Sequence, residues 1–113
     1  MLAVGDHVKP GEKLRLHVRD AGTAREDLEM LLSPQVFDTP AAAALVFCCN
    51  GRGKGLYGAP DGDIAPLQAA LGGNVPAAGM FCAGEIGPVG ERNLLHGHTA
   101  SIAVVRGKES AAR

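Results

Sequence analysis

Three groups of polar residues follow apolar segments of this chain, and their residue types are suited to binding a small charged molecule. In the first group, Asn50 and Arg52 alternate with Gly51 and Gly53 directly after the apolar run at residues 41–49. Glycine lets backbone amides approach a ligand closely, and the planar guanidinium of arginine binds anions through two parallel hydrogen bonds. The first group therefore predicts a loop at the end of a buried strand that binds a small polar or anionic ligand.

This glycine-rich loop differs from two well-known phosphate-binding loops. Lys54 is followed by Gly55 and Leu56 rather than by serine or threonine, which excludes the P-loop of nucleotide triphosphatases. A dinucleotide-binding loop opens directly into a helix, and we predict no helix immediately after Gly53. A plain glycine-rich turn with a surface arginine is the alternative to a binding loop.

Two adjacent cysteines end the apolar run before this loop. Their side chains point to opposite faces of a strand, so the two thiols have different surroundings. Cys48 is expected in the core, where cysteine usually acts as a small hydrophobic residue. Cys49 is expected at the strand end beside the charge of Arg52, either as a residue that lines the ligand site or as a reactive thiol.

The second group centres on Glu85, a single carboxylate between Gly84 and Gly87 at the end of another apolar segment. A carboxylate in apolar surroundings needs a hydrogen-bond donor. One interpretation is structural: Glu85 accepts backbone amides of a turn at residues 84–90 or pairs with a strand-end arginine. The other is functional: Glu85 faces Arg52 across the site or binds an amine of the ligand.

The third group contains His96, His98 and Thr99. Residues 96 and 98 would share one face of a strand, a spacing that binds a transition metal if Cys82 or Glu85 adds a third ligand. The sequence gives no evidence that either residue is a third ligand, so we predict no metal site. His96 and Thr99 are more typical of hydrogen-bonded structural residues or of ligand contacts.

Hydrophobic periodicity places these groups on an α/β or α+β domain. Alternation of apolar and cationic residues at 13–19 predicts a half-exposed strand, and a shorter strand precedes it at 2–7. Thr23 and Glu26 form a capping box for a helix that continues to about Ser33.

A buried strand at residues 42–49, a second helix capped by Asp63, and strands at 75–83 and 96–105 follow. The predicted order is β-β-α-β-α-β-β, a layered domain in which two helices pack on a mixed sheet. The apolar positions of these elements predict one shared core of Leu14, Leu16, Val18, Leu28, Leu31, Val46, Phe81, Ile102 and Val104.

The composition is typical of a single globular domain. The chain has 113 residues, a formal net charge of −1, 46% hydrophobic residues and three cysteines. The near-zero charge argues against nucleic-acid binding, and the apolar runs are too short for membrane insertion. Three cysteines do not make a disulfide framework, which favours a cytoplasmic location. We assign residues 1–108 to one domain and 109–113 to a loose tail.

The polar groups also occur in an order that resembles a known family. The patterns are R-D-A…A…D-L, then F-x-C-x-G-R-G with L-Y-G, then V-P-x-x-G-x-F-x-x-G-E-I-G-P, and finally L-H-x-x-T. Together they resemble the C-terminal half of the FIST domain, named after F-box and intracellular signal transduction proteins. The resemblance extends from about residue 4 to 105 and implies that residues 1–108 are a truncated C-terminal FIST domain. It further implies an N-terminal FIST half or a signalling output domain as a partner.

The resemblance implies a cytoplasmic sensory domain that binds a small ligand, amino acid-like or another metabolite, and relays the event to a partner domain. We predict no catalytic residues and no cofactor, although family members that resemble nitric-oxide sensors make haem, with one histidine as axial ligand, a further option. The alternatives are a protein-interaction scaffold and an enzyme that uses Cys49 or Cys82 with His96 and Glu85. The predicted ligand-binding residues are Cys49, Asn50, Gly51, Arg52, Gly53, Glu85, His96 and Thr99.

Overall fold

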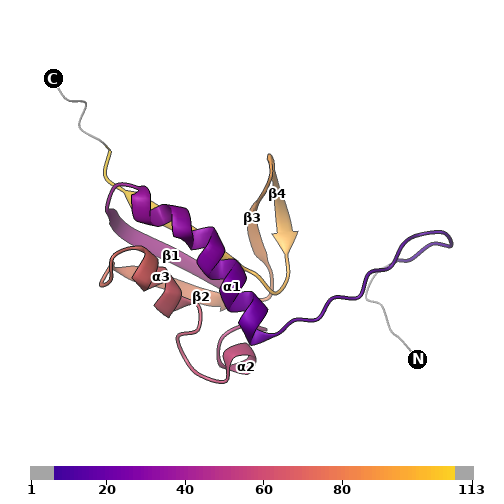
Figure 1. The fold of residues 1–113 in the computed structure, drawn as a ribbon. Helices are drawn as coiled ribbons and strands as arrows, with labels where there is room; N and C mark the ends of the chain where they lie inside the picture. Colours follow the sequence, from indigo (N-terminus) through magenta and orange to yellow (C-terminus); the bar gives the residue numbers. More distant parts are fainter. Residues whose placement is uncertain (1–6, 109–113) are drawn as a thin grey trace.

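The computed structural model describes residues 7–108 (Figure 1). The predicted tail at 109–113 and nearly all of the predicted strand at 2–7 lie outside the described residues. The elements, in chain order, are α1 (Ala21–Leu32), the 3-10 helix η1 (Ser33–Phe37), β1 (Ala41–Cys49), α2 (Lys54–Tyr57), α3 (Ile64–Ala70), β2 (Ala77–Cys82), β3 (Glu85–Val89), β4 (Arg92–His96) and β5 (Ala100–Arg106).

A three-stranded mixed sheet forms the centre of the domain. β1 lies in the middle, parallel to β2 on one side and antiparallel to β5 on the other. β3 and β4 form a separate antiparallel hairpin that projects away from this sheet (Figure 1). The predicted α/β fold, with helices and a mixed sheet, is confirmed.

The core lies between one face of the sheet and the helices α1 and α3. Every second residue of β1 points toward these helices, as the period of two in a strand requires. Fully burying a leucine side chain stabilises a fold by about 1.5–3 kcal/mol, so the helix leucines fasten both helices to the sheet. The buried core cluster consists of Leu28, Leu32, Ala44, Val46, Cys48 and Leu67.

The prediction of a strand at residues 13–19 is wrong. This segment runs in an extended path away from the domain, and Leu14, Leu16 and Val18 are exposed (Figure 1). Alternation makes a stable strand only when a neighbouring strand pairs with it, and no described strand pairs with this segment. Three of the predicted core residues therefore lie outside the core.

The other predicted core residues are divided between the interior and the edges of the domain. Leu28 and Val46 are buried, and Ile102 packs against the core. Leu31 and Phe81 are exposed, because Leu31 lies away from the buried stripe of α1 and Phe81 belongs to the edge strand β2. Helical and strand periodicity identified α1, β1 and β2 but did not say which face of each is covered.

Helix α1 begins at Ala21, earlier than the predicted capping box. Its cap is Asp20, whose carboxylate accepts the amide of Thr23 at 3.0 Å and the Thr23 hydroxyl at 2.7 Å. These hydrogen bonds lower the pKa of Asp20. α1 has 12 residues, and no helix among residues 7–108 is long and apolar enough to cross a bilayer.

The segment between β2 and β5 differs most from the prediction. The predicted turn at residues 84–90 is the strand β3, which pairs with β4 in a hairpin. The predicted strand at 96–105 is interrupted after His96 and resumes at Ala100. The sequence did not indicate β3 because glycine and Pro88 are depleted in strands.

Candidate functional site

The glycine-rich loop is held against the end of the sheet by backbone hydrogen bonds. The amide of Asn50 donates to the carbonyl oxygen of Cys82 at 2.8 Å. The amide of Arg52 donates to the carbonyl oxygen of Cys49, also at 2.8 Å. The loop therefore joins the ends of β1 and β2. The side chain of Asn50 is exposed to solvent.

Gly53 leads directly into the one-turn helix α2, which corrects the prediction that no helix follows the loop. Its φ of 64° and ψ of −147° belong to a region that only glycine visits readily. A Cβ atom at this position would lie 2.8 Å from the ring of Phe81. Backbone freedom at Gly53, rather than helix propensity, allows this short helix to begin.

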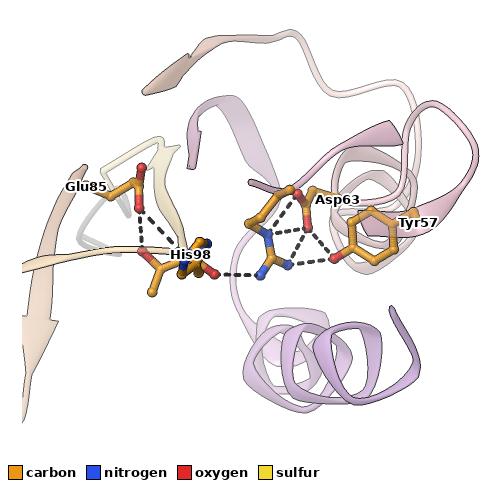
Figure 2. Close-up of polar contacts among 6 residues, drawn as sticks. Tyr57, Asp63, Glu85 and His98 are labelled. Atoms are coloured by element: carbon orange, nitrogen blue, oxygen red, sulfur yellow. Dashed lines mark hydrogen bonds and ion pairs between the residues drawn. The ribbon is translucent and has the colours of Figure 1, made fainter. Parts of the chain in front are cut away.

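Arg52 points into the protein, and only 9% of it is exposed. Its Nε and Nη2 atoms donate to the carboxylate of Asp63 at 3.0 and 2.6 Å, and Nη2 also donates to the Tyr57 hydroxyl at 2.6 Å (Figure 2). Nη1 donates to the carbonyl oxygen of His98 at 3.3 Å. The Tyr57 hydroxyl in turn donates to Asp63 at 2.7 Å. These contacts form a buried cluster, here called the Arg52 cluster, of Arg52, Asp63 and Tyr57.

The charges of the Arg52 cluster stabilise one another. Burial by itself raises the pKa of Asp63, but the hydrogen bonds from Arg52 and Tyr57 outweigh it and hold that pKa below its usual value. The hydrogen bond to Asp63 raises the pKa of Arg52. Burial, with Asp63 nearby, raises the pKa of Tyr57 to about 12 and that of the Cys48 thiol to about 12. At neutral pH the ion pair is therefore charged, and the hydroxyl and the thiol keep their protons.

Glu85 is almost fully buried at the start of β3, with 2% of it exposed. Its Oε2 atom accepts the hydroxyl of Thr99 at 2.9 Å and the amide of Thr99 at 3.4 Å (Figure 2). Its Oε1 atom is buried and has no hydrogen-bond partner among the described residues. Such an atom is unusual in a folded protein, because an unpaired buried oxygen costs free energy. Glu85 therefore has capacity to accept one more hydrogen bond.

The two histidines do not share a strand face, which corrects the basis of the predicted spacing. His96 ends β4, and its Nε2 atom donates to the carbonyl oxygen of Gly87 at 3.0 Å within the hairpin. His98 lies in the loop before β5, with a left-handed φ of 62°. A left-handed residue turns the chain, so the alternation of a strand does not extend through His98.

Cys49 contacts His98 rather than His96. Its Sγ atom lies 3.9 Å from Nδ1 of His98 and accepts the amide of Gly51 at 3.4 Å. The guanidinium of Arg19 contacts the same Nδ1 atom. A guanidinium can only donate, so Nδ1 acts as the acceptor in that contact. Cys49, which is buried, thus lies next to a polar pair from two distant segments.

A cavity of about 280 Å³ lies between the start of α1 and the loop that precedes β5. Arg19, Arg52 and His98 contribute hydrogen-bond donors to its lining, and Asp20 and Asp27 contribute carboxylates. Its apolar part comes from leucines and an alanine of α1. The cavity therefore combines positive and negative groups beside an apolar surface, which is the typical composition of a small-molecule site.

The structure brings some of the predicted ligand-binding residues together and separates others. Arg52 and Thr99 line the 280 Å³ cavity, and Glu85 reaches it only through its hydrogen bonds to Thr99. His96 lines a second cavity of about 480 Å³, which shares Thr99 with the first. The amide of Gly51 bonds to Cys49. The assignment of these residues to ligand binding stays a prediction.

Several residues of this region had no site role in the sequence analysis. Asp63 was interpreted as a helix cap, yet it makes no capping hydrogen bond and pairs with Arg52. A buried arginine needs a counter-ion. Had Arg52 been predicted to be buried, a nearby carboxylate such as Asp63 would have been expected beside it. The others are Arg19, Asp20, Asp27, Tyr57 and His98.

The described residues offer no obvious place for a metal or a haem. No group of three His, Cys, Asp or Glu residues within 7–108 is arranged to hold a metal ion. His96 uses Nε2 for the bond to Gly87, and no arginine, lysine or tyrosine is among the described residues that line the cavity beside it. Such side chains often pair with haem propionates, and the described lining of this cavity supplies none of them.

Sequence comparisons relate the chain to longer proteins. The pattern of the FIST C domain family matches residues 1–88. Over 105 residues the chain is 43% identical to an uncharacterized protein of Mycobacterium bovis, covering 91% of the chain and 27% of that protein. It is 41% identical, with the same coverage, to an uncharacterized protein of Mycobacterium tuberculosis. The chain thus spans 27% of the length of these relatives. No solved structure matches it significantly.

Proposed function

Because the chain belongs to the FIST C domain family, which is associated with signal transduction, we propose that it is a cytoplasmic input module that binds a small metabolite and relays binding to a partner domain. The ligand occupies the 280 Å³ cavity between α1 and the loop before β5. An N-terminal FIST half or a signalling output domain receives the signal.

The observation that carries this proposal is the pairing of opposite charges in one small cavity. Arg19 and His98 line this cavity together with the carboxylates of Asp20 and Asp27. A ligand with both an anionic and a cationic group satisfies both sets, whereas a simple anion would meet the carboxylates unfavourably. This supports an amino acid-like ligand, whose carboxylate and ammonium group are separated by one carbon atom.

The Arg52 cluster supports the cavity, and the guanidinium of Arg52 is not the main group that binds the ligand. Arg52 reaches the cavity wall, but most of its donors bond to Asp63, Tyr57 and the carbonyl oxygen of His98. The bond to His98 orients the loop that carries the cavity's imidazole. Arg52 therefore positions the site, and the freer guanidinium of Arg19 meets the ligand.

Thr99 provides a physical route from the cavity to the hairpin. It lines the cavity, and its hydroxyl donates to Glu85 at the first position of β3. A ligand that takes the Thr99 hydroxyl as its own partner would leave the carboxylate of Glu85 with only the 3.4 Å hydrogen bond from the Thr99 amide. Relief of that cost by movement of β3 and β4 would carry the signal to a domain that contacts the hairpin.

Calorimetric titration of the chain with the common amino acids tests the proposal, with matched amines and carboxylic acids that lack one charged group. We expect saturable binding of at least one amino acid and an affinity at least about 10-fold lower, 1.4 kcal/mol, for its single-charge analogues. Asp27→Asn should weaken binding, and Glu29→Gln on the same helix serves as the control. Absence of saturable binding, or equal affinity of Asp27→Asn and the parent, would contradict the proposal.

Thiol chemistry at Cys49 is a second candidate, favoured by the 3.9 Å contact between its Sγ and the imidazole of His98. Cys49 was expected to act with His96 and Glu85, which instead bond to Gly87 and Thr99. The same titration with Cys49→Ser separates the two functions. A binding module keeps its affinity in this variant, whereas an enzyme of this type loses turnover.

A further inference from the structure

We propose that the outer edge of β2 accepts a β-strand from the part of a full-length FIST protein that lies outside the segment matched by this chain. This interaction surface is independent of which ligand the cavity binds.

Only one side of the β2 backbone is hydrogen-bonded to another strand, and that strand is β1. The ladder between β1 and β2 begins at the carbonyl oxygen of Pro76, which accepts the amide of Ala44, and ends at that of Cys82, which accepts the amide of Asn50. The backbone N–H and C=O groups of successive residues point to alternate sides of a strand. The backbone groups of the even-numbered residues of β2 therefore point toward β1.

The odd-numbered residues Ala77, Gly79 and Phe81 consequently direct their N–H and C=O groups away from β1. β2 is an edge strand, and no described strand pairs with this side. Three N–H groups and three C=O groups therefore form a template for one additional strand.

The side chains of β2 lack the features that usually protect an edge. Its sequence, AAGMFC, contains no charged residue and no proline. Met80 is 62% exposed and Phe81 is 57% exposed. Natural edge strands usually carry lysine, proline or a bulge that prevents pairing with another chain. The sequence of β2 is therefore typical of a strand whose edge is covered by another strand in the assembled protein.

The outer edge of β5 provides an internal contrast. Ser101 of β5 donates to the carbonyl oxygen of Ile86, which places the hairpin beside one end of this edge. At the other end, Arg106 donates to the carbonyl oxygen of Thr39 and to Gln35. A charged residue and a neighbouring hairpin thus occupy the β5 edge, whereas β2 has neither.

The sheet face that points away from α1 and α3 supports the same conclusion. β1 is apolar on both faces, a composition typical of strands that are covered on both sides in parallel arrangements. Leu45 of β1 and Val105 of β5 are nevertheless exposed on this face. Met80 belongs to the same face by its register with Phe47, so the open face and the open edge are continuous.

The length of the relatives identifies the occupant. In the mycobacterial proteins the matched segment is 27% of a longer polypeptide, so a strand from the remainder is present at high effective concentration. A strand from a second copy of the chain would lack this advantage. The surface is therefore suited to a strand from the rest of the same polypeptide.

Residue-resolved hydrogen exchange tests the inference without any mutation. In the chain alone, we expect the amides of Ala78, Met80 and Cys82 to exchange slowly and those of Ala77, Gly79 and Phe81 to exchange fast. In the intact Mycobacterium bovis relative, the amides aligned with both sets should be slow, with the outer set slowed at least about 100-fold relative to the chain alone.

Two results would overturn the inference. The first is the same alternation of fast and slow amides in the intact relative, which would leave the edge unpaired. The second is slow exchange of the outer set in the chain alone that disappears on dilution, because a second copy would then be the occupant.

A substitution in the intact relative adds a matched control. Lysine at the position aligned with Met80 should remove protection of the outer amides, since a charge on an edge strand opposes pairing. Lysine at the position aligned with Val36, which is exposed on η1, should leave them protected. Equal protection in both variants would count against strand addition, and the unmutated comparison remains decisive if the first variant unfolds.

Discussion

Two buried charged residues, Arg52 after β1 and Glu85 at the start of β3, occupy similar positions but differ in their hydrogen bonds. Arg52 bonds to Asp63, to Tyr57 and to the carbonyl oxygen of His98. Glu85 bonds only to Thr99 and leaves Oε1 without a partner among the described residues. A buried charge with several hydrogen-bond partners stabilises the fold, whereas one with an unused acceptor has capacity for a further hydrogen bond.

Removal of the counter-ion of Arg52 should have the largest effect on stability. Asp63→Ala leaves a buried guanidinium without its carboxylate, and loss of one partner of a buried pair typically costs about 3–5 kcal/mol. Urea denaturation followed by circular dichroism measures this change in the free energy of unfolding. Glu29→Ala, at an exposed position of α1, is the control. If Asp63→Ala lowers the free energy of unfolding by less than about 1 kcal/mol, the pair of Arg52 and Asp63 does not contribute substantially to stability.

A substitution at the Glu85 contact should have a smaller effect. Thr99→Val keeps the shape of the side chain but removes the hydroxyl that donates to Oε2, which leaves the carboxylate with only the 3.4 Å amide bond. Loss of a partner from a buried acceptor costs about 1–3 kcal/mol. The same denaturation experiment compares this variant with Asp63→Ala. A cost equal to that of Asp63→Ala would erase the distinction between the two regions.

The pH dependence of stability should show the contribution of Asp63 with the smallest effect of the three. The pKa of Asp63 is lower in the folded protein than its usual value near 3.9, so the folded state gains stability above that pH. This stability is lost as the pH falls below about 4 and through the folded pKa, with a slope of at most about 1.4 kcal/mol per pH unit for one group.

Unfolding free energies of the parent and of Asp63→Asn between pH 7 and about pH 2 measure this slope. The parent should lose more stability than the variant over the acid range. Asp20, whose pKa is also lowered, contributes a slope that both proteins share. Identical acid profiles would mean that Asp63 does not carry the stabilising charge.

Apolar runs and helical stripes were sufficient to predict β1, β2, α1 and α3, because burial dominates the choice of those elements. The hairpin was missed because the sequence of β3 contains a glycine and a proline, and the contacts that form it come from β4. Alternation at residues 13–19 predicted a strand whose partner is absent from the described residues. The sequence patterns therefore identified most of the helices and strands, but not which segments pair or which faces are covered.

The candidate site shows the same limit in its chemistry. Arg52, Glu85 and Thr99 were selected by residue type, but the contacts of Arg52 depend on Asp63, which is eleven residues away and bonds through its side chain. The pattern L-H-x-x-T contains His96 and Thr99 but not His98, so His98 was left out of the predicted site, yet it lines the cavity from a left-handed backbone position. Side-chain partners across loops depend on tertiary geometry, which a linear spacing does not contain.

The central position of β1 also determines when the sheet can form as the chain is made. Ala44 pairs with Ala77 of β2, and Ala41 pairs with Arg106 of β5, so both neighbours of β1 are synthesised long after it. Joining such distant segments requires closure of long loops before any ladder bond is gained, which slows folding. On the ribosome, β1 therefore waits with one edge unpaired until β5 emerges. During that interval this apolar strand is the segment most open to aggregation and to capture by chaperones.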